Sequence, residues 1–153
     1  MEIFVDADAC PVKEIIIKVA KERDIPVTMI MDTSHWWQND YAKVINVDKE
    51  RDGVDIALIN MTHKNDIVVT QDYGVAAMAL GKGAWALNQN GLIFSSSNMD
   101  KLLFERHLGQ KVRRAGGRTK NIRRRTKEDD ERFESALIKV IENAEKAETE
   151  LLG

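Results

Sequence analysis

The hydrophobic pattern of the chain alternates between short apolar runs and longer stretches with helical periodicity. The short runs predict buried strands at residues 2–5, 27–31, 42–47, 67–70 and 84–87. Between them, apolar residues recur every three or four positions, which predicts helices at residues 11–24, 54–61 and 73–81. Strands that alternate with helices in this way are typical of an α/β sheet with parallel strands and helices on both faces.

Capping and helix-breaking residues predict where the helices begin and end. Pro11 is expected at the first position of the first helix, where its missing N–H is harmless. The polar residues 95–98 offer N-caps for a helix over about 99–112, and "AGG" at 115–117 ends it. An apolar stripe with a mostly acidic opposite face predicts an amphipathic helix at about 128–150. This stripe packs either on the domain or on a second subunit, which leaves a homo-oligomer open.

Length and composition predict a single domain over residues 1–153. The chain is 43% apolar, which is enough to build one core. Its one cysteine excludes an intramolecular disulfide, and its longest apolar run, "VAAMAL", is far too short to cross a bilayer. We therefore expect a cytoplasmic protein with no membrane partner.

The net charge of −2 hides an uneven distribution. Residues 106–127, called here the basic strip, contain ten Lys or Arg and no acid, whereas the remaining residues carry 13 basic and 25 acidic side chains. Such a strip favours binding of a polyanion such as a nucleic-acid backbone. The alternative is a solvated loop whose positive charges balance the acidic side chains of the same protein. The residues predicted to contact nucleic acid are Arg113, Arg114, Arg118, Lys120, Arg123, Arg124 and Arg125.

Four aspartates are expected on one rim of the sheet. Asp6 and Asp72 follow the ends of two predicted strands, Asp55 opens a helix at that edge, and Asp8 can reach the rim from its loop. Converging carboxylates repel one another unless a cation lies among them, and oxygen ligands suit Mg²⁺ or Mn²⁺. Such an ion assists attack of water on a phosphodiester. Each acid alone is also explained by a helix cap or a helix dipole.

Four segments of the chain resemble a known family. They are "DADACPVK" (6–13), "GVDIALINM" (53–61), "DIVVTQDYGVAAMAL" (66–80) and "RRAGGRTK" (113–120). Together they resemble the uncharacterised YaiI/YqxD family, which is grouped with PIN-like and NYN-like metal-dependent nuclease domains. The resemblance covers nearly the whole chain. It implies a three-layer PIN-like domain with a mostly parallel sheet in the order 3-2-1-4-5 and C-terminal helices.

The same resemblance implies roles for individual acids. It carries Asp6, Asp55 and Asp72 over as the residues that hold Mg²⁺ or Mn²⁺. Asp8 is not carried over by the resemblance, but from its loop it is expected to assist catalysis as a further ligand or a water-positioning base. Asp66 precedes its strand and is expected at the opposite end of the sheet. The chain departs from the nuclease pattern after Asp72, because Tyr73 and Gly74 stand where a further acid is common.

Three functions follow from these patterns. The first is a divalent-metal-dependent nuclease, with RNA favoured over DNA. The second is a non-catalytic nucleic-acid-binding module that uses the basic strip. The third is a haloacid-dehalogenase-like phosphatase with Asp6 as nucleophile and Asp8 as general acid.

The remaining reactive and aromatic residues carry weaker patterns. Cys10 is predicted to be a small buried side chain, because none of the three histidines is placed as a base or in a zinc-binding spacing. "SHWW" (34–37) predicts core or interface residues, with base stacking as the alternative. "FSSS" (94–97) predicts a helix cap on the same rim as the acids, with phosphate binding as the alternative.

Overall fold

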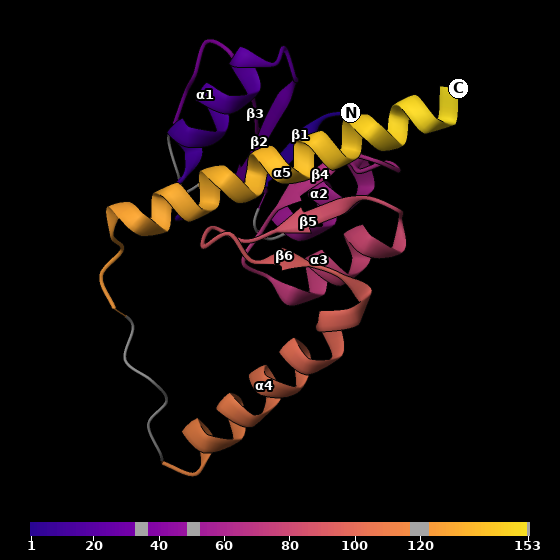
Figure 1. The fold of residues 1–153 in the computed structure, drawn as a ribbon. Helices are drawn as coiled ribbons and strands as arrows, with labels where there is room; N and C mark the ends of the chain where they lie inside the picture. Colours follow the sequence, from indigo (N-terminus) through magenta and orange to yellow (C-terminus); the bar gives the residue numbers. More distant parts are fainter. Residues whose placement is uncertain (33–36, 49–52, 117–122, 153) are drawn as a thin grey trace.

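The computed structural model describes residues 1–32, 37–48, 53–116 and 123–152. Its centre is a six-stranded sheet in the order β3-β2-β1-β4-β5-β6 (Figure 1). The first five strands are parallel and β6 is antiparallel to β5. The strands are β1 (Ile3–Asp6), β2 (Val27–Asp32), β3 (Lys43–Val47), β4 (Ile67–Val69), β5 (Trp85–Leu87) and β6 (Ile93–Phe94). The expected order 3-2-1-4-5 is confirmed, so β1 and β4 lie side by side at the centre of the sheet.

Five helices complete the described part of the chain. They are α1 (Lys13–Glu22), α2 (Val54–Met61), α3 (Tyr73–Gly81), α4 (Ser96–Arg114) and α5 (Lys127–Leu152). The pleat of β1 divides the core into two layers, since successive side chains point to opposite faces. Ile3 and Val5 pack with α1 and α5, whereas Phe4 packs with α2, α3 and the start of α4. The α/β class and its three layers are therefore confirmed.

The apolar stripe of α5 packs on its own domain. Phe133, Leu137, Val140 and Ile141 are completely buried in the layer that contains α1. This decides between the two expected partners of the stripe, because a surface buried within the domain is not available to a second subunit. Among the described residues, no helix has both the length and the apolar character needed to cross a membrane.

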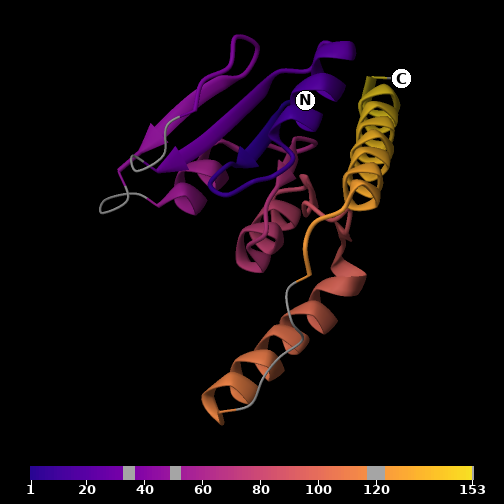
Figure 2. The same ribbon diagram turned by 90° about the vertical axis from the view of Figure 1, so that its left-hand side faces the viewer.

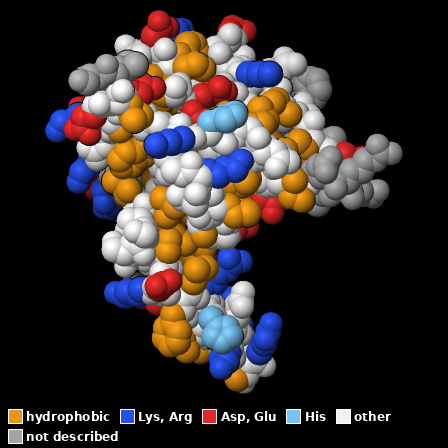
Figure 3. Space-filling model, turned by 90° about the vertical axis from the view of Figure 1, so that its right-hand side faces the viewer, with side chains coloured by type: hydrophobic (Ala, Val, Ile, Leu, Met, Phe, Trp, Pro, Cys, Tyr) orange, Lys and Arg blue, Asp and Glu red, His pale blue; other side chains and the backbone are white. Residues whose placement is uncertain are grey.

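The helix α4 is different, because it extends away from the sheet as an arm (Figures 1 and 2). Only its first turns are held by the core, through the buried Met99 and the partly buried Leu102. Beyond them, Phe104 and Leu108 are exposed. In the space-filling view, Lys and Arg side chains and hydrophobic side chains lie next to one another on this arm (Figure 3).

Two predicted helix starts were wrong, and one strand was not predicted. The helix α1 begins at Lys13 rather than at Pro11, because the backbone turns first: Cys10 donates to the Ala7 carbonyl at 3.2 Å, and Ala9 has a φ of 55°. The helix α4 begins at Ser96, three residues before its predicted start, and it ends at Arg114, before the predicted break, with Ala115 as its C-cap. The edge strand β6 was not predicted, since two residues carry no recognisable period.

Candidate functional site

The carboxyl ends of β1 and β4 bring Asp6 and Asp72 to the same rim. Asp6 ends β1, and Asp72 caps α3 shortly after β4 ends. The buried side chain of Thr70 connects them: its Oγ1 donates to Asp6 Oδ2 at 3.1 Å and accepts from the Asp72 backbone N–H at 3.0 Å. One hydroxyl group therefore sets the position of both acids. Thr70 was not predicted as a site residue.

Asp72 lies on this rim and also caps a helix, which was the alternative explanation for an acid at this position. Its Oδ1 accepts from the backbone N–H groups of Gly74 at 2.8 Å and Val75 at 3.2 Å, which makes it the N-cap of α3. The glycine suits this arrangement, because a Cβ at Gly74 would lie 3.1 Å from that same oxygen. The Asp72 carboxylate is thus held in one orientation by the start of α3.

Asp8 lies beside Asp6, on the loop that follows β1. Its Oδ2 accepts from the backbone N–H of Asp32 at 3.2 Å, which ties the loop after β1 to the end of β2. Asp6 and Asp8 line one small cavity of about 40 Å³. The other lining residues are Cys10, Val69, Thr70, Gln71 and Gln89. We call this the acid pocket.

The electrostatics of the acid pocket disfavour the charged form of Asp6. Burial raises the pKa of Asp6 above its ordinary value, and the nearby carboxylates of Asp8, Asp72 and Asp55 raise it further, while the Thr70 hydrogen bond acts in the opposite sense. The charges of the other three acids predicted from the sequence therefore act on Asp6. A cation placed at this rim would relieve the repulsion and lower the pKa of Asp6 again.

Asp55 is the outermost of the four acids. Its side chain is exposed and folds back over the start of α2, where Oδ1 accepts from the Ile56 backbone N–H at 3.0 Å. A Cβ at Gly53 would lie 2.6 Å from the same oxygen, so glycine permits this conformation. Neither Asp55 nor Asp72 lines the acid pocket, and the charge of each acts on Asp6 from outside it.

The carboxylates do not form a closed cage for a metal ion. Within the described ranges, no three His, Cys, Asp or Glu side chains lie close enough together to hold one. The donor chemistry nevertheless fits a hydrated Mg²⁺, which commonly uses one or two carboxylates and completes its shell with water and substrate phosphate. Asp6 and Asp72 are the residues that fit this requirement, because they share the rim and are joined through Thr70.

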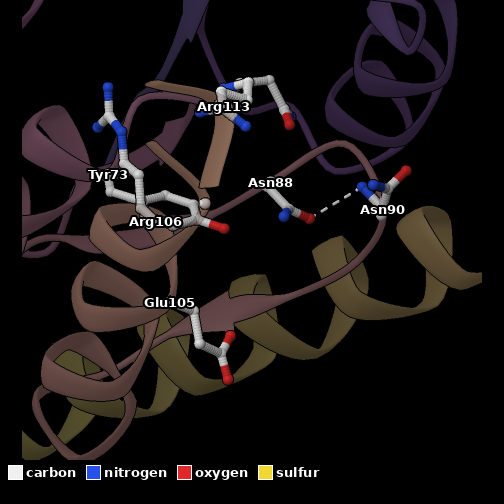
Figure 4. Close-up of a pocket in the computed structure, with 8 residues that line it drawn as sticks. Tyr73, Asn88, Asn90, Glu105, Arg106 and Arg113 are labelled. Carbon is white, nitrogen blue, oxygen red and sulfur yellow. Dashed lines mark hydrogen bonds between the residues drawn. The ribbon is translucent and has the colours of Figure 1, made fainter. Parts of the chain in front are cut away.

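A larger cavity adjoins the acid pocket, and its volume is about 500 Å³. Gln71 lines both spaces, so they meet at that side chain. The residues that line the larger cavity are Gln71, Tyr73, Asn88, Asn90, Glu105, Arg106, Gly109 and Arg113 (Figure 4). We call it the arginine cavity. Of these residues, only Arg113 was predicted to bind nucleic acid. The others were not predicted, because the walls come from three segments that lie apart in the sequence.

The basic strip divides into two parts. Arg113 lines the arginine cavity, whereas Arg123 and Arg125 are bonded to the protein itself. Arg123 pairs with the buried Asp129 through two bonds of 2.6 and 3.1 Å, and Arg125 donates to Asp130 at 2.7 Å. In the C-terminal part of the strip, these positive charges therefore balance acidic side chains of the same protein, as the alternative explanation expected.

Other predicted binding residues are placed as follows. Arg114 and Arg124 are exposed. Arg118 and Lys120 lie outside the described residues, as do the first three residues of "SHWW". The remaining tryptophan of that motif, Trp37, is partly buried and packs against the core, as expected.

Ser95 and Cys10 agree with their simpler interpretations. Ser95 accepts from the backbone N–H of Asn98 at 3.3 Å as the N-cap of α4, so capping is confirmed for "FSSS". Cys10 is half-buried, and burial raises the pKa of its thiol. A raised pKa disfavours the thiolate, so Cys10 is not prepared to act as a nucleophile.

The phosphatase interpretation finds little support in the acid pocket. An aspartyl-phosphate mechanism of the haloacid-dehalogenase type also needs a lysine close to the nucleophile, and the described residues that line the pocket include none. Asp8 is instead engaged as an acceptor, since both of its carboxylate oxygens face the Asp32 backbone N–H, at 3.4 and 3.2 Å.

Asp66 is confirmed at the amino end of the sheet, where its role is structural. Its two carboxylate oxygens accept from the backbone N–H groups of Glu2 at 2.9 Å and His63 at 2.8 Å. We expect Asp66→Ala to lower the free energy of unfolding by about 3 kcal/mol, because two partly buried donors lose a charged acceptor. Chemical denaturation measures this change. Glu142→Ala, which removes an exposed acid from α5, is the control and should have almost no effect.

Arg125 stabilises the turn between β5 and β6. It donates to the Gln89 carbonyl at 2.8 Å and to Asn90 Oδ1 at 3.1 Å, and these two residues belong to the walls of the acid pocket and the arginine cavity. We expect Arg125→Ala to cost about 1–2 kcal/mol of stability and to speed amide exchange in this turn. Arg124→Ala is the matched control, and equal exchange rates in both variants would contradict this role.

Comparisons with known proteins agree with the expected family. Residues 4–143 match the family described as uncharacterized BCR, YaiI/YqxD family. The chain is 70% identical over 138 residues to the UPF0178 protein of Ruminiclostridium cellulolyticum, with 90% of each chain covered. It is 54% identical to the UPF0178 protein of Alkaliphilus oremlandii, over 90% of this chain and 89% of that one. No solved structure matches. The chain therefore belongs to the YaiI/YqxD family.

Proposed function

We propose that this protein is a divalent-cation-dependent nuclease that hydrolyses phosphodiester bonds, in RNA more than in DNA. One observation carries the proposal: an acidic pocket that favours a cation directly adjoins a cavity lined by two arginines that favours a phosphate backbone, and Gln71 lines both. Because Gln71 lines both spaces, a nucleic-acid strand that occupied the arginine cavity would extend toward the acid pocket. The strand order, shared with the expected PIN-like fold, also supports this function.

Each residue of the rim has its own role in the proposed reaction. Asp6 and Asp72 would hold Mg²⁺ or Mn²⁺, and Thr70 keeps their positions fixed. The bound ion supplies charge neutralisation at the phosphate and a lower pKa for a bound water. Asp8 lines the same pocket and positions a water molecule there, while Asp55 adds negative charge from outside. Arg106 and Arg113 bind the substrate backbone.

A second function has an observation in its favour. Because no three metal-binding side chains are grouped within the described residues, a nucleic-acid-binding module without catalysis also fits the arginine cavity. The two functions differ in what the acids do. Binding without catalysis does not need the carboxylates of Asp6 and Asp72, whereas the nuclease does.

The test is a cleavage assay with the purified wild-type protein. Fluorescently labelled single-stranded RNA and DNA of the same sequence are incubated with Mg²⁺, with Mn²⁺ or with EDTA. The nuclease proposal expects products only with a divalent cation, and faster cleavage of RNA. Salt-sensitive binding of both strands with no product under any of these conditions would replace the nuclease by the binding module.

A further inference from the structure

We propose that the arginine cavity is a binding site for one nucleotide unit of the substrate strand, next to the unit whose phosphodiester is cleaved. The proposal rests on the proposed function and adds a substrate-binding site to it. The cavity, of about 500 Å³, lies within the usual size range of small-ligand sites and accommodates a single nucleotide. Its lining is polar throughout, with three amide side chains and a tyrosine beside the arginines.

The charges of the cavity favour a phosphate. Arg106 and Arg113 are seven residues apart on α4, so they share one face of the helix, and both line the cavity. The single acid of the lining, Glu105, extends away from both arginines in Figure 4, and it lies 3.9 Å from Lys101. The arginines are therefore not neutralised by Glu105, and guanidinium groups bind phosphate through paired hydrogen bonds.

The aromatic and amide groups of the cavity suit a base. The Arg106 guanidinium lies over the Tyr73 ring, 5.9 Å from its centroid, and Phe94 holds the ring edge-on at 5.6 Å. Bases stack on arginine planes and on aromatic rings in single-strand recognition. Asn88 and Asn90, on the β5–β6 turn, line the other side of the cavity (Figure 4).

The turn that carries these amides is held in place before any ligand binds. Asn88 Oδ1 accepts from the backbone N–H groups of Asn90 at 2.9 Å and Leu92 at 3.0 Å. Gly91 has a φ of +85°, and a Cβ there would lie 2.8 Å from the Arg132 carbonyl oxygen, so the turn requires glycine. Together with the bonds from Arg125, this network fixes one wall of the cavity. Preorganisation of this kind favours specific binding.

The test measures nucleotide binding in EDTA, where no cleavage takes place. Adenosine 5′-monophosphate is titrated into the full chain by calorimetry, with inorganic phosphate and adenosine as partial ligands. The monophosphate should bind more tightly than either part and should compete with a labelled single-stranded oligonucleotide. Arg106→Gln and Arg113→Gln should each weaken it at least tenfold, about the effect of one charged hydrogen bond. Thermal melting should show that both variants are folded.

The control is Lys111→Gln, which removes one positive charge from the same helix. Lys111 is five residues from Arg106, so it projects from a different face of α4; it is exposed and does not line the cavity, so its loss should leave nucleotide binding unchanged. The inference is overturned if inorganic phosphate binds as tightly as the nucleotide, if the arginine variants bind like wild type, or if the nucleotide does not compete with the strand.

The result of the nucleotide-binding test can be distinguished from the result of the nuclease assay. Nucleotide binding that depends on Arg106 and Arg113, without any divalent-dependent cleavage, would retain this site and reject the nuclease. Divalent-dependent cleavage that continues at the wild-type rate and KM in both arginine variants would retain the nuclease and reject this site.

Discussion

Asp6→Asn is expected to abolish divalent-dependent cleavage and, in the absence of divalent cations, to raise the melting temperature. The loss of a metal-binding carboxylate removes several kcal/mol of transition-state stabilisation, which lowers the rate by roughly a thousandfold. The gain in stability follows from the raised pKa of Asp6, which shows that its charged form is disfavoured in the folded protein. The assay is cleavage of a labelled strand, together with melting in EDTA.

The pH dependence of stability tests whether the charged form of Asp6 destabilises the folded protein. Because the folded-state pKa of Asp6 lies above its ordinary value of 3.8, wild type loses stability as pH rises through this raised pKa, and the variant does not. The two proteins should therefore converge at acidic pH and differ at neutral pH. Asp100→Asn removes an exposed acid from α4 and serves as the control. An Asp6→Asn protein that melts lower than wild type at neutral pH would contradict this account.

Mg²⁺ or Mn²⁺ should stabilise wild type but not Asp6→Asn. A ligand at a hundred times its Kd stabilises the folded state by about 2.7 kcal/mol, which is readily seen in a melting curve. This readout does not depend on catalysis, so it also reports on a protein that binds the ion without cleaving a strand. Equal stabilisation of both proteins would place the cation elsewhere.

Asp72→Asn and Asp72→Ala are expected to separate the two roles of this residue. The asparagine side chain keeps an oxygen that can accept from Gly74 and Val75, so the cap of α3 and the stability are retained. Alanine loses the cap, which costs about 1 kcal/mol and lowers the melting temperature by roughly 3 °C. Both variants remove the carboxylate, so both should lose cleavage by a hundredfold or more.

The matched control for Asp72 is Ser95→Ala. Ser95 caps α4 as Asp72 caps α3, but it contributes no carboxylate to the rim. Its loss should lower stability by a similar amount and leave cleavage intact. If Asp72→Asn cleaves as fast as wild type, Asp72 is only a helix cap, and the cation would then be held without it.

The helices and strands could be predicted because their signals are local. The bounds of α2 and α3 agree with the predicted ranges 54–61 and 73–81, since their ends lie next to glycine, aspartate and charged residues. The start of α1 could not be predicted in the same way. The turn at Ala9 and Cys10 depends on a backbone hydrogen bond that the spacing of apolar residues does not reveal.

The candidate site was predicted in part. Asp6 and Asp72 were expected on one rim, because parallel strands end at the same edge, and their adjacency followed from the implied strand order. Their connection through Thr70 was not expected, since a buried threonine in a strand carries no functional pattern. Asp55 was expected among the metal-binding acids, and this stays a prediction: its side chain folds back over the start of α2, and neither it nor Asp72 lines the acid pocket.

The class of the fold, the family and the end of the sheet at which the acids lie could all be predicted, because periodicity, motifs and strand direction are properties of neighbouring residues. Which charges are free to bind a ligand depends on tertiary contacts. Arg123 and Arg125 belong to the same basic strip as Arg113, yet Asp129 and Asp130 engage the first two, while the third lines a cavity. That difference depends on which segments distant in sequence meet in space, and a run of charges does not specify its partners.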